Sequence, residues 1–339
     1  MAGVEFYSGI LCAGFVNAHS HLELAYLRGA IEEGGGFAAF AESMGKVRGE
    51  FSEQEQLTAI AEADKAIWQE GVDVVGDIVN GETSFAVKAT SKIYYHNFLE
   101  VFGLRLCNLE RQRELLKYPH TSLTPHSTYS VQDAPFREMC GGDSREPLSI
   151  HFLETADEAE LYRGGGSLHK WYESVGFECD FLHYETPARR IVACTPKDRR
   201  VMLVHSCAIT QNDIEILTNH FSMPVSWVLC PRSNNYISGI EPRCVELLRS
   251  SGGNINICIG TDSLASNWSL SVVEELKMFR DIPLAELLQW ATINGAKALG
   301  IDDKYGSLEV GKRSGVVNIT GVDLANFSLT PESKARRIL

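Results

Sequence analysis

The chain of 339 residues lacks the features that mark membrane, secreted and nucleic-acid-binding proteins. No apolar run reaches the roughly 18 residues of a membrane span, and the first residues lack the basic-then-apolar layout of a signal peptide. The formal charge of −13 has the wrong sign for attraction to nucleic acid or an anionic membrane. We therefore predict a cytoplasmic protein without nucleic acid or membrane as partner. A homo-oligomer remains open.

Cysteines are present but are not arranged in pairs. None of the nine is spaced as Cys-x-x-Cys, and several lie inside apolar runs. This usage is typical of reduced core residues, and it argues against a disulfide framework or a thiolate metal site.

Short apolar runs recur along the chain, most of them separated by segments with helical spacing. Such alternation is typical of a parallel sheet with crossover helices. The predicted strands are Ile10–Ala18, Val72–Val79, Ile93–Val101, Ser122–His126, Leu148–Leu153, Val201–His205, Val225–Leu229 and Ile255–Ile259. Eight strands predict an α/β fold of the (β/α)8 barrel type, a TIM barrel. A doubly wound open sheet is the alternative, but no Gly-x-Gly-x-x-Gly turn opens a helix.

The end of the chain has a different pattern. A helix is predicted over Pro283–Leu299, and the turn-rich segment Tyr305–Ile319 ends in a β-branched run. We therefore expect a barrel over residues 9–300. Residues 301–339 would be tail strands of a small β subdomain, a remnant of a β-sandwich, with residues 1–8 as the candidate to complete it.

The first predicted strand ends in His19-Ser20-His21. Side chains two apart on a strand point to the same face, so His19 and His21 would project together. Imidazole nitrogens so placed suit zinc, iron and similar ions. Two surface histidines are the alternative interpretation.

Further polar residues occur where other predicted strands end. His126 ends the fourth strand, His151 lies near the end of the fifth, His205 ends the sixth, and Asp262 follows the eighth. Barrel enzymes place their sites at the C-terminal ends of the strands. The sequence therefore predicts that five histidines and an aspartate gather on one rim.

The segments around these residues resemble the amidohydrolase superfamily, and within it the purine, nucleoside and triazine aminohydrolases. The resemblance extends from about Gly9 to about Ile319. It rests on the segments Gly14–His21, Pro125–Val131, His151–Thr155, Val204–Ser206 and Gly260–Ser263, with the loops Arg232–Asn234 and Ser266–Asn267.

The resemblance implies one divalent metal, zinc or alternatively iron, held by His19, His21, His151 and Asp262. Such an ion would lower the pKa of a bound water and make it a nucleophile. The resemblance also implies three catalytic residues. Glu154 would shuttle a proton to the substrate ring, His205 would orient the water, and Asp262 would accept its proton.

Three residues are predicted to bind substrate: His126, Glu23 and Asn267. For Glu23, an ion pair with Arg28 is the alternative. Glu100, near the end of the third strand, either supports a metal ligand or is a solvated charge.

The implied reaction is hydrolytic deamination of an aminated nitrogen heterocycle. Adenosine-type nucleosides are the first substrate group and guanine-type bases the second. One alternative is hydrolysis of another bond, carbon–halogen or cyclic amide, on the same metal centre. A metal-binding barrel without catalysis is the other alternative.

The chain departs from the family pattern in two places. About a dozen residues precede the first strand, where the family has some tens, so we expect a late start or missing segments, with Leu104–Cys107 and Met278–Asp281 as suspect joins. The acidic loop that nucleoside deaminases use after strand one has no clear match, and Glu42 and Glu50 are the nearest stand-ins.

Overall fold

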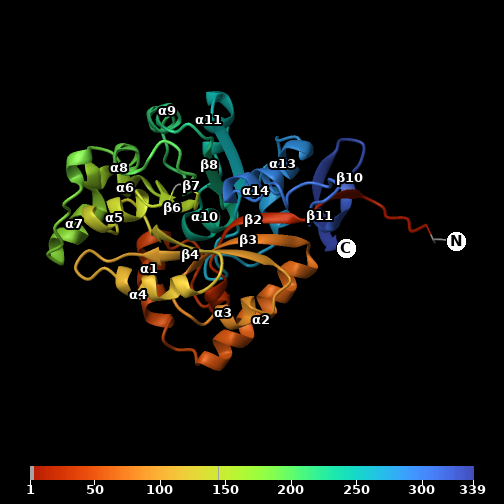
Figure 1. Ribbon diagram of the computed structural model, residues 1–339, viewed down its shortest axis with the longest axis horizontal. Helices are drawn as coiled ribbons and strands as arrows, with labels where there is room; N and C mark the ends of the chain where they lie inside the picture. Colours follow the sequence, from red (N-terminus) through yellow and green to blue (C-terminus); the bar gives the residue numbers. More distant parts are fainter. Residues whose placement is uncertain (1–3, 144) are drawn as a thin grey trace.

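The apolar runs of the sequence form parallel strands that lie side by side in chain order. The computed structural model describes residues 4–143 and 145–339. Its parallel strands are β2 (Phe15–Ser20), β3 (Val72–Val79), β4 (Tyr94–Val101), β5 (Thr121–Pro125), β6 (Leu148–Phe152), β7 (Val201–His205), β8 (Val225–Leu229) and β9 (Ile255–Ile259). They form two four-stranded sheets, β2-β3-β4-β5 and β6-β7-β8-β9 (Figure 1).

Backbone contacts at the C-terminal ends of the strands join the two sheets. The His151 N–H donates to the His126 carbonyl over 2.8 Å, and the Thr261 N–H donates to the His19 carbonyl over 2.9 Å. Isolated parallel bridges pair Ser127 with His151 and Ser20 with Asp262 at the same places. The predicted α/β barrel class is confirmed, and both seams between the sheets lie at predicted site residues.

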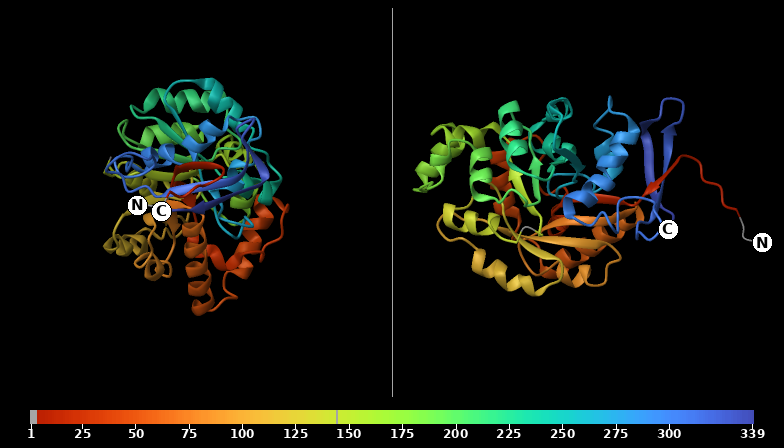
Figure 2. Two further views of the ribbon diagram at one scale, coloured as in Figure 1. Left: turned by 90° about the vertical axis from the view of Figure 1, so that its right-hand side faces the viewer. Right: turned by 45° about the horizontal axis from the view of Figure 1, so that its top comes forward.

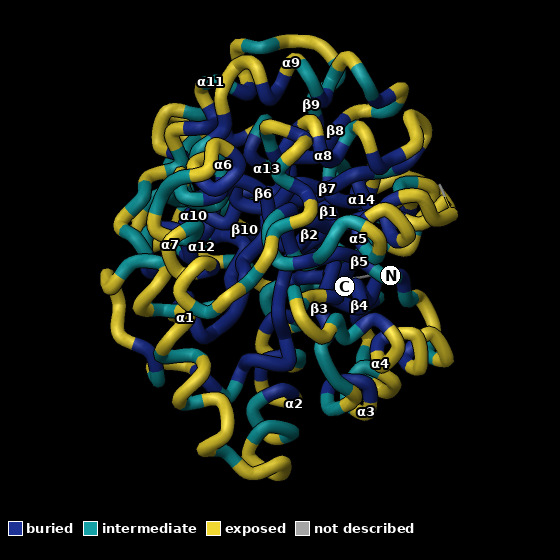
Figure 3. The backbone as a smooth tube through the Cα atoms, turned by 90° about the vertical axis from the view of Figure 1, so that its left-hand side faces the viewer, coloured by how far each residue is buried: buried dark blue, intermediate teal, exposed yellow. Residues whose placement is uncertain are grey.

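Helices cover the outside of the strands. The α-helices are α1 (Gly36–Val47), α2 (Glu53–Gln69), α3 (Phe85–Lys88), α4 (Leu109–Glu114), α5 (Asp133–Cys140), α6 (Ala156–Tyr162), α7 (Gly166–Ser174), α8 (Pro187–Cys194), α9 (Gln211–His220), α10 (Pro231–Ser238), α11 (Cys244–Ser251), α12 (Val272–Leu276), α13 (Leu284–Trp290) and α14 (Ile293–Leu299). Short 3₁₀ helices are η1 (Leu22–Leu27), η2 (Leu115–Lys117) and η3 (Leu182–Tyr184). Figure 3 shows the strands buried in the centre and exposed chain around them. Across the described residues, no helix combines the length and apolarity needed to cross a membrane.

The cysteines of the described residues are all free, and most of them are buried. This agrees with the prediction of reduced core cysteines.

The helix predicted over Pro283–Leu299 is interrupted. It forms two helices, α13 and α14, because the Ala291 carbonyl accepts a hydrogen bond from the Val16 N–H of β2 over 2.8 Å. A carbonyl that bonds to the barrel cannot continue the helical ladder. The sequence pattern carried no sign of this tertiary contact.

The first predicted strand, Ile10–Ala18, is also two strands. Its first part, β1 (Ile10–Ala13), pairs antiparallel with β10 (Val316–Asp323), which pairs with β11 (Ser328–Arg337). The chain leaves this small sheet at Gly14, where a Cβ would come within 1.9 Å of the Asp73 carboxylate. The small sheet lies at one end of the barrel, beside the C-terminus (Figure 2).

The strand that completes the small sheet therefore lies inside the range predicted for the barrel. Residues 4–8 form no strand, and residues 1–3 lie outside the described residues. Residues 1–8 were the candidate to complete the small sheet, but the strand that pairs with β10 is Ile10–Ala13. The wider division into residues 9–300 and 301–339 stays a prediction.

Arg337 ties the small sheet to the barrel. Its guanidinium lies 3.4 Å from the centre of the Trp68 ring and 2.7 Å from the Asp73 carboxylate, and both charged side chains are less than a tenth exposed. We expect Arg337→Ala to lower the free energy of unfolding by about 3 kcal/mol, because it leaves a buried carboxylate unpaired. Urea unfolding measures this. The exposed neighbour Arg336→Ala is the control, and equal stability of the two variants would contradict the prediction.

Candidate metal centre and active site

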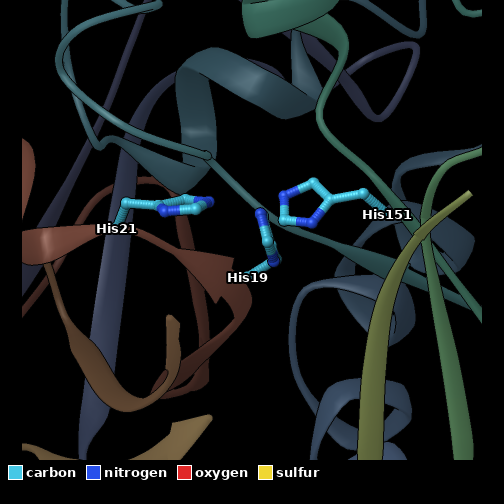
Figure 4. Close-up of side chains that lie close together, drawn as sticks. All are labelled: His19, His21 and His151. Carbon is cyan, nitrogen blue, oxygen red and sulfur yellow. The ribbon is translucent and has the colours of Figure 1, made fainter. Parts of the chain in front are cut away.

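Three histidines from opposite sides of the barrel converge at the ends of the strands. His19 lies in β2, His21 follows that strand directly, and His151 lies in β6 (Figure 4). One ring nitrogen from each lies within 4.8 Å of the others. Asp262 follows β9, and its Oδ1 lies 3.5 Å from His21 Nε2 and 4.0 Å from His19 Nε2.

His19 is the central residue of this cluster, and its environment fits a metal ion. The side chain is fully buried, yet neither ring nitrogen has a hydrogen-bond partner among the described residues. Burial, reinforced by His151 and His21, holds the pKa of His19 well below its ordinary value. The imidazole is therefore neutral, which is the form that binds metals. A buried polar group without a partner costs about 1–3 kcal/mol, and a divalent cation would remove that cost.

Neighbouring groups orient two of the other donors, His151 and Asp262, toward the same point. The His151 Nδ1–H donates to the His126 carbonyl over 2.9 Å, which leaves Nε2 as the free donor atom. The Oδ2 of Asp262 accepts hydrogen bonds from the hydroxyls of Ser233 (2.5 Å) and Ser266 (3.1 Å), which leaves Oδ1 for the cluster. Such outer contacts are what fix the ligands in metal sites of proteins.

The charge state of Asp262 also suits a metal ligand. Burial would raise the pKa of its carboxyl, but His21, His205 and the Ser233 hydroxyl outweigh burial and lower it. Asp262 has left-handed backbone, with a φ of 56°, a conformation uncommon for residues other than glycine. The carboxylate is therefore ionised and is held in a strained turn, as is common at functional sites.

Glu154 and His205 form a second pair beside the cluster. Glu154 Oε2 lies 3.8 Å from His205 Nε2, and His205 Nδ1 lies 2.8 Å from Asn234 Oδ1. Because an amide oxygen only accepts, Nδ1 of His205 carries a hydrogen and donates it to Asn234, which leaves Nε2 directed toward Glu154. Burial, partly opposed by His205, raises the pKa of Glu154. A carboxyl with a raised pKa is suited to donate a proton near neutral pH.

His126 lies next to His151 rather than inside the metal cluster. The two rings are stacked with centroids 4.6 Å apart, and His126 Nδ1 lies 3.0 Å from the Ser130 hydroxyl. Burial lowers the pKa of His126 to about 3, so this ring is neutral.

Glu100 is buried nearby, 3.7 Å from His151 Nδ1, and accepts a hydrogen bond from the Asn80 side chain. This environment agrees with a residue that supports a metal ligand and not with a solvated charge.

Comparison with known proteins identifies the family of the chain. A model of the amidohydrolase family matches residues 10–324. The chain belongs to the amidohydrolase family. It is therefore a hydrolase, and the donors at the strand ends of this amidohydrolase fit a divalent metal ion.

Among its relatives is an adenosine deaminase of Helicobacter pylori, 28% identical over an alignment of 329 positions that covers 91% of this chain and 78% of the relative. A 5-methylthioadenosine/S-adenosylhomocysteine deaminase of Thermoanaerobacter pseudethanolicus is 27% identical, over 94% of this chain and 74% of the relative. The crystal structure of Helicobacter pylori aminofutalosine deaminase with methylthio-coformycin superimposes with a TM-score of 0.80 and 26% identity. The superposition covers 92% of this chain and 80% of the aminofutalosine deaminase chain.

Glu23 is buried in the amidohydrolase, close to the metal cluster. Its carboxylate lies 3.4 Å from the Arg48 guanidinium and accepts a hydrogen bond from the Asn80 N–H over 3.0 Å. The alternative pairing with Arg28 is wrong, because the Arg28 guanidinium donates instead to the Trp268 carbonyl. Burial raises the pKa of Glu23.

Asn267 has little freedom to bind a ligand. Its amide group donates to the Thr261 carbonyl (3.0 Å) and to Glu275 (2.7 Å), and its oxygen accepts from Arg232 (3.1 Å). The structure gives Asn267 a part in holding the loop after β9. Its predicted contact with substrate stays a prediction.

The two stand-ins for an acidic substrate loop lie on the surface. Glu42 and Glu50 are exposed, and Glu42 forms an ion pair with Lys46 on α1. Neither side chain lies among the buried site residues.

Sequence reasoning did not assign the residues that orient the ligands. Ser233, Asn234 and Ser266 contact Asp262 or His205, and all three are buried. The signal was present, since these residues lie in the two loops that resemble the family after strands seven and eight. A serine or asparagine in a loop has many uses, and only the folded structure shows which atom it contacts.

Proposed function

We propose that this protein is a metal-dependent aminohydrolase that removes the exocyclic amine of an adenosine-type nucleoside or purine base and releases ammonia. The observation that carries the proposal is the convergence of His19, His21, His151 and Asp262 next to the pair Glu154 and His205. The deaminase names of the relatives support it.

We propose zinc as the ion, with iron as the alternative, since three imidazoles and one carboxylate are donors that zinc accepts. His19, His21, His151 and Asp262 would hold it. A divalent ion in such a site lowers the pKa of a coordinated water and supplies a nucleophile at neutral pH.

Glu154 moves the proton in the proposed reaction. Burial raises its pKa and so favours the protonated carboxyl, which donates its proton to a ring nitrogen beside the amine-bearing carbon. Protonation of the ring makes that carbon a better acceptor for the attacking oxygen. When the tetrahedral intermediate collapses, the amine takes the proton that Asp262 accepted from the water and leaves as ammonia, while the new hydroxyl returns a proton to Glu154 and becomes the carbonyl of the product.

Asp262 and His205 handle the attacking water. The ionised carboxylate of Asp262 accepts a proton from the water through Oδ1, since Oδ2 already has two hydroxyl partners. His205 leaves Nε2 for the water, because its Nδ1–H is bonded to Asn234. A hydrogen bond at Nε2 therefore orients the water toward the substrate.

The substrate would lie on the side of His126, whose neutral ring stacks on His151 at the edge of the metal cluster. Glu23 and Asn267 are the other proposed contacts. Methylthioadenosine, adenosylhomocysteine and aminodeoxyfutalosine are the first substrates to test, and guanine-type bases the second.

Incubation of the zinc-loaded protein with a panel of aminopurines, their nucleosides and aminotriazines tests the proposal. We expect at least one adenosine-type nucleoside to release one ammonia for each molecule consumed. Mass spectrometry of the products separates deamination from cleavage of a carbon–halogen or cyclic amide bond. If no compound reacts while about one ion is bound per chain, the protein is a metal-binding barrel and the proposal is wrong.

A further inference from the structure

Glu158 is a buried acid on α6, four residues after Glu154. Its side chain is 2% exposed, and burial raises its pKa to about 8. A buried carboxyl needs hydrogen-bond partners, and both oxygens of Glu158 have one. These partners lie in two different segments of the active site.

The first partner is the backbone before Glu154. The Leu153 N–H donates to Glu158 Oε2 over 2.6 Å. Leu153 has a left-handed φ of 46°, which costs a residue other than glycine roughly 1–3 kcal/mol. Because Leu153 directly precedes Glu154, this turn sets the direction in which Glu154 leaves the end of β6.

The second partner is Thr128, whose hydroxyl donates to the other oxygen of Glu158. Thr128 lies in the loop after β5 that begins at His126. Its carbonyl accepts hydrogen bonds from Arg190 (2.6 Å) and the Tyr162 hydroxyl (2.7 Å).

Arg190, which donates to the Thr128 carbonyl, is held in place by its surroundings. Its side chain is completely buried, and the guanidinium lies 4.1 and 4.2 Å from the ring centres of Phe136 and Phe181. Glu158 thus connects a rigid anchor to the strained turn at Leu153.

We propose that Glu158 is a positioning residue for Glu154: it holds the Leu153 turn against Thr128 and thereby aims the Glu154 carboxyl at the substrate ring. The inference rests on the proposed function, in which Glu154 moves the proton. Glu158 itself touches none of the proposed metal ligands.

Two variants of Glu158 in the zinc-loaded protein separate side-chain length from acidity. Glu158→Asp keeps the acid but shortens the side chain, so it cannot reach Leu153 and Thr128 together. Glu158→Gln loses the acid but keeps the length: its amide oxygen accepts from the Leu153 N–H, and its NH2 donates to the Thr128 hydroxyl, which reverses that hydrogen bond. We expect Glu158→Asp to lower kcat about 100-fold, as a misplaced catalytic group does, with KM and bound zinc changed less than threefold. Glu158→Gln should retain at least ten times the kcat of Glu158→Asp. Glu160→Asp, an exposed acid on the same helix, is the matched control and should behave as the wild type.

A second readout shows whether the effect passes through Glu154. In a Glu154→Gln background, Glu158→Asp should reduce the residual kcat less than threefold. When two residues act as a unit, the effects of their substitutions on kcat are not additive. An equal loss in both backgrounds, or a Glu158→Asp variant within threefold of the wild type, would overturn the inference.

If Glu158→Asp does not fold, Thr128→Val takes its place, because it removes the other contact at nearly the same volume. It should lower kcat about tenfold, again only when Glu154 is present, and a loss below threefold overturns the inference. Failure of the proposed function has a different signature, since the wild type would then release no ammonia from any nucleoside.

Discussion

In a His19→Ala variant, we expect bound metal to fall from about one ion per chain to less than about a tenth, and ammonia release to fall about 10³-fold or more. His19 lies at the centre of the cluster and has no protein partner for either ring nitrogen among the described residues, so its donor atom is not replaced by another group. Without the ion, the pKa of water stays far above neutral and the nucleophile is lost. Elemental analysis after dialysis and an ammonia assay measure both effects.

The matched control for this experiment is His183→Ala. His183 is exposed and lies outside the site, so this variant should keep its metal and its activity. Circular dichroism checks that His19→Ala is folded, since the side chain it removes is buried. A folded His19→Ala variant that binds about one ion per chain would show that the cluster does not hold the metal.

We expect Glu154→Gln to lower kcat by about 10²–10⁴-fold while the protein keeps its metal. The amide has nearly the size and shape of the carboxyl, but it cannot donate and recover a proton, and general acid–base catalysis contributes about this factor. Glu154 is not part of the cluster that would hold the ion; its Oε2 lies 3.8 Å from His205 Nε2. Metal content and KM should therefore stay close to those of the wild type.

Glu160→Gln is the control for this variant, because Glu160 is exposed on α6 and faces no site residue. Steady-state kinetics with the best substrate of the panel compare the three proteins. A Glu154→Gln variant with more than about a tenth of the wild-type kcat would rule out the proton-shuttle role. If the variant lost its metal as well, Glu154 would belong to the metal site instead.

The sequence determined the strands and the residues at their ends. A buried strand is a short apolar run, and its limits are visible locally: Val72–Val79, Val201–His205, Val225–Leu229 and Ile255–Ile259 are strands in the structure with the predicted limits. The rule that barrel sites lie at the C-terminal ends of strands then selected His19, His151 and Asp262.

Tertiary structure decided how those residues are oriented. Ser20 and Asp262 lie 242 positions apart in the chain, and only closure of the barrel brings β2 next to β9. Other distant contacts divide the helix before Leu299 and place Ile10–Ala13 in the small sheet, because backbone groups take partners from distant segments.

The free atom on each ligand was likewise set by distant contacts. The His126 carbonyl leaves Nε2 of His151 free, Ser233 leaves Oδ1 of Asp262 free, and Asn234 sets the tautomer of His205. A local pattern reports which side chains stand at a strand end. It does not report which hydrogen bonds they make, since those depend on segments that meet only when the barrel closes.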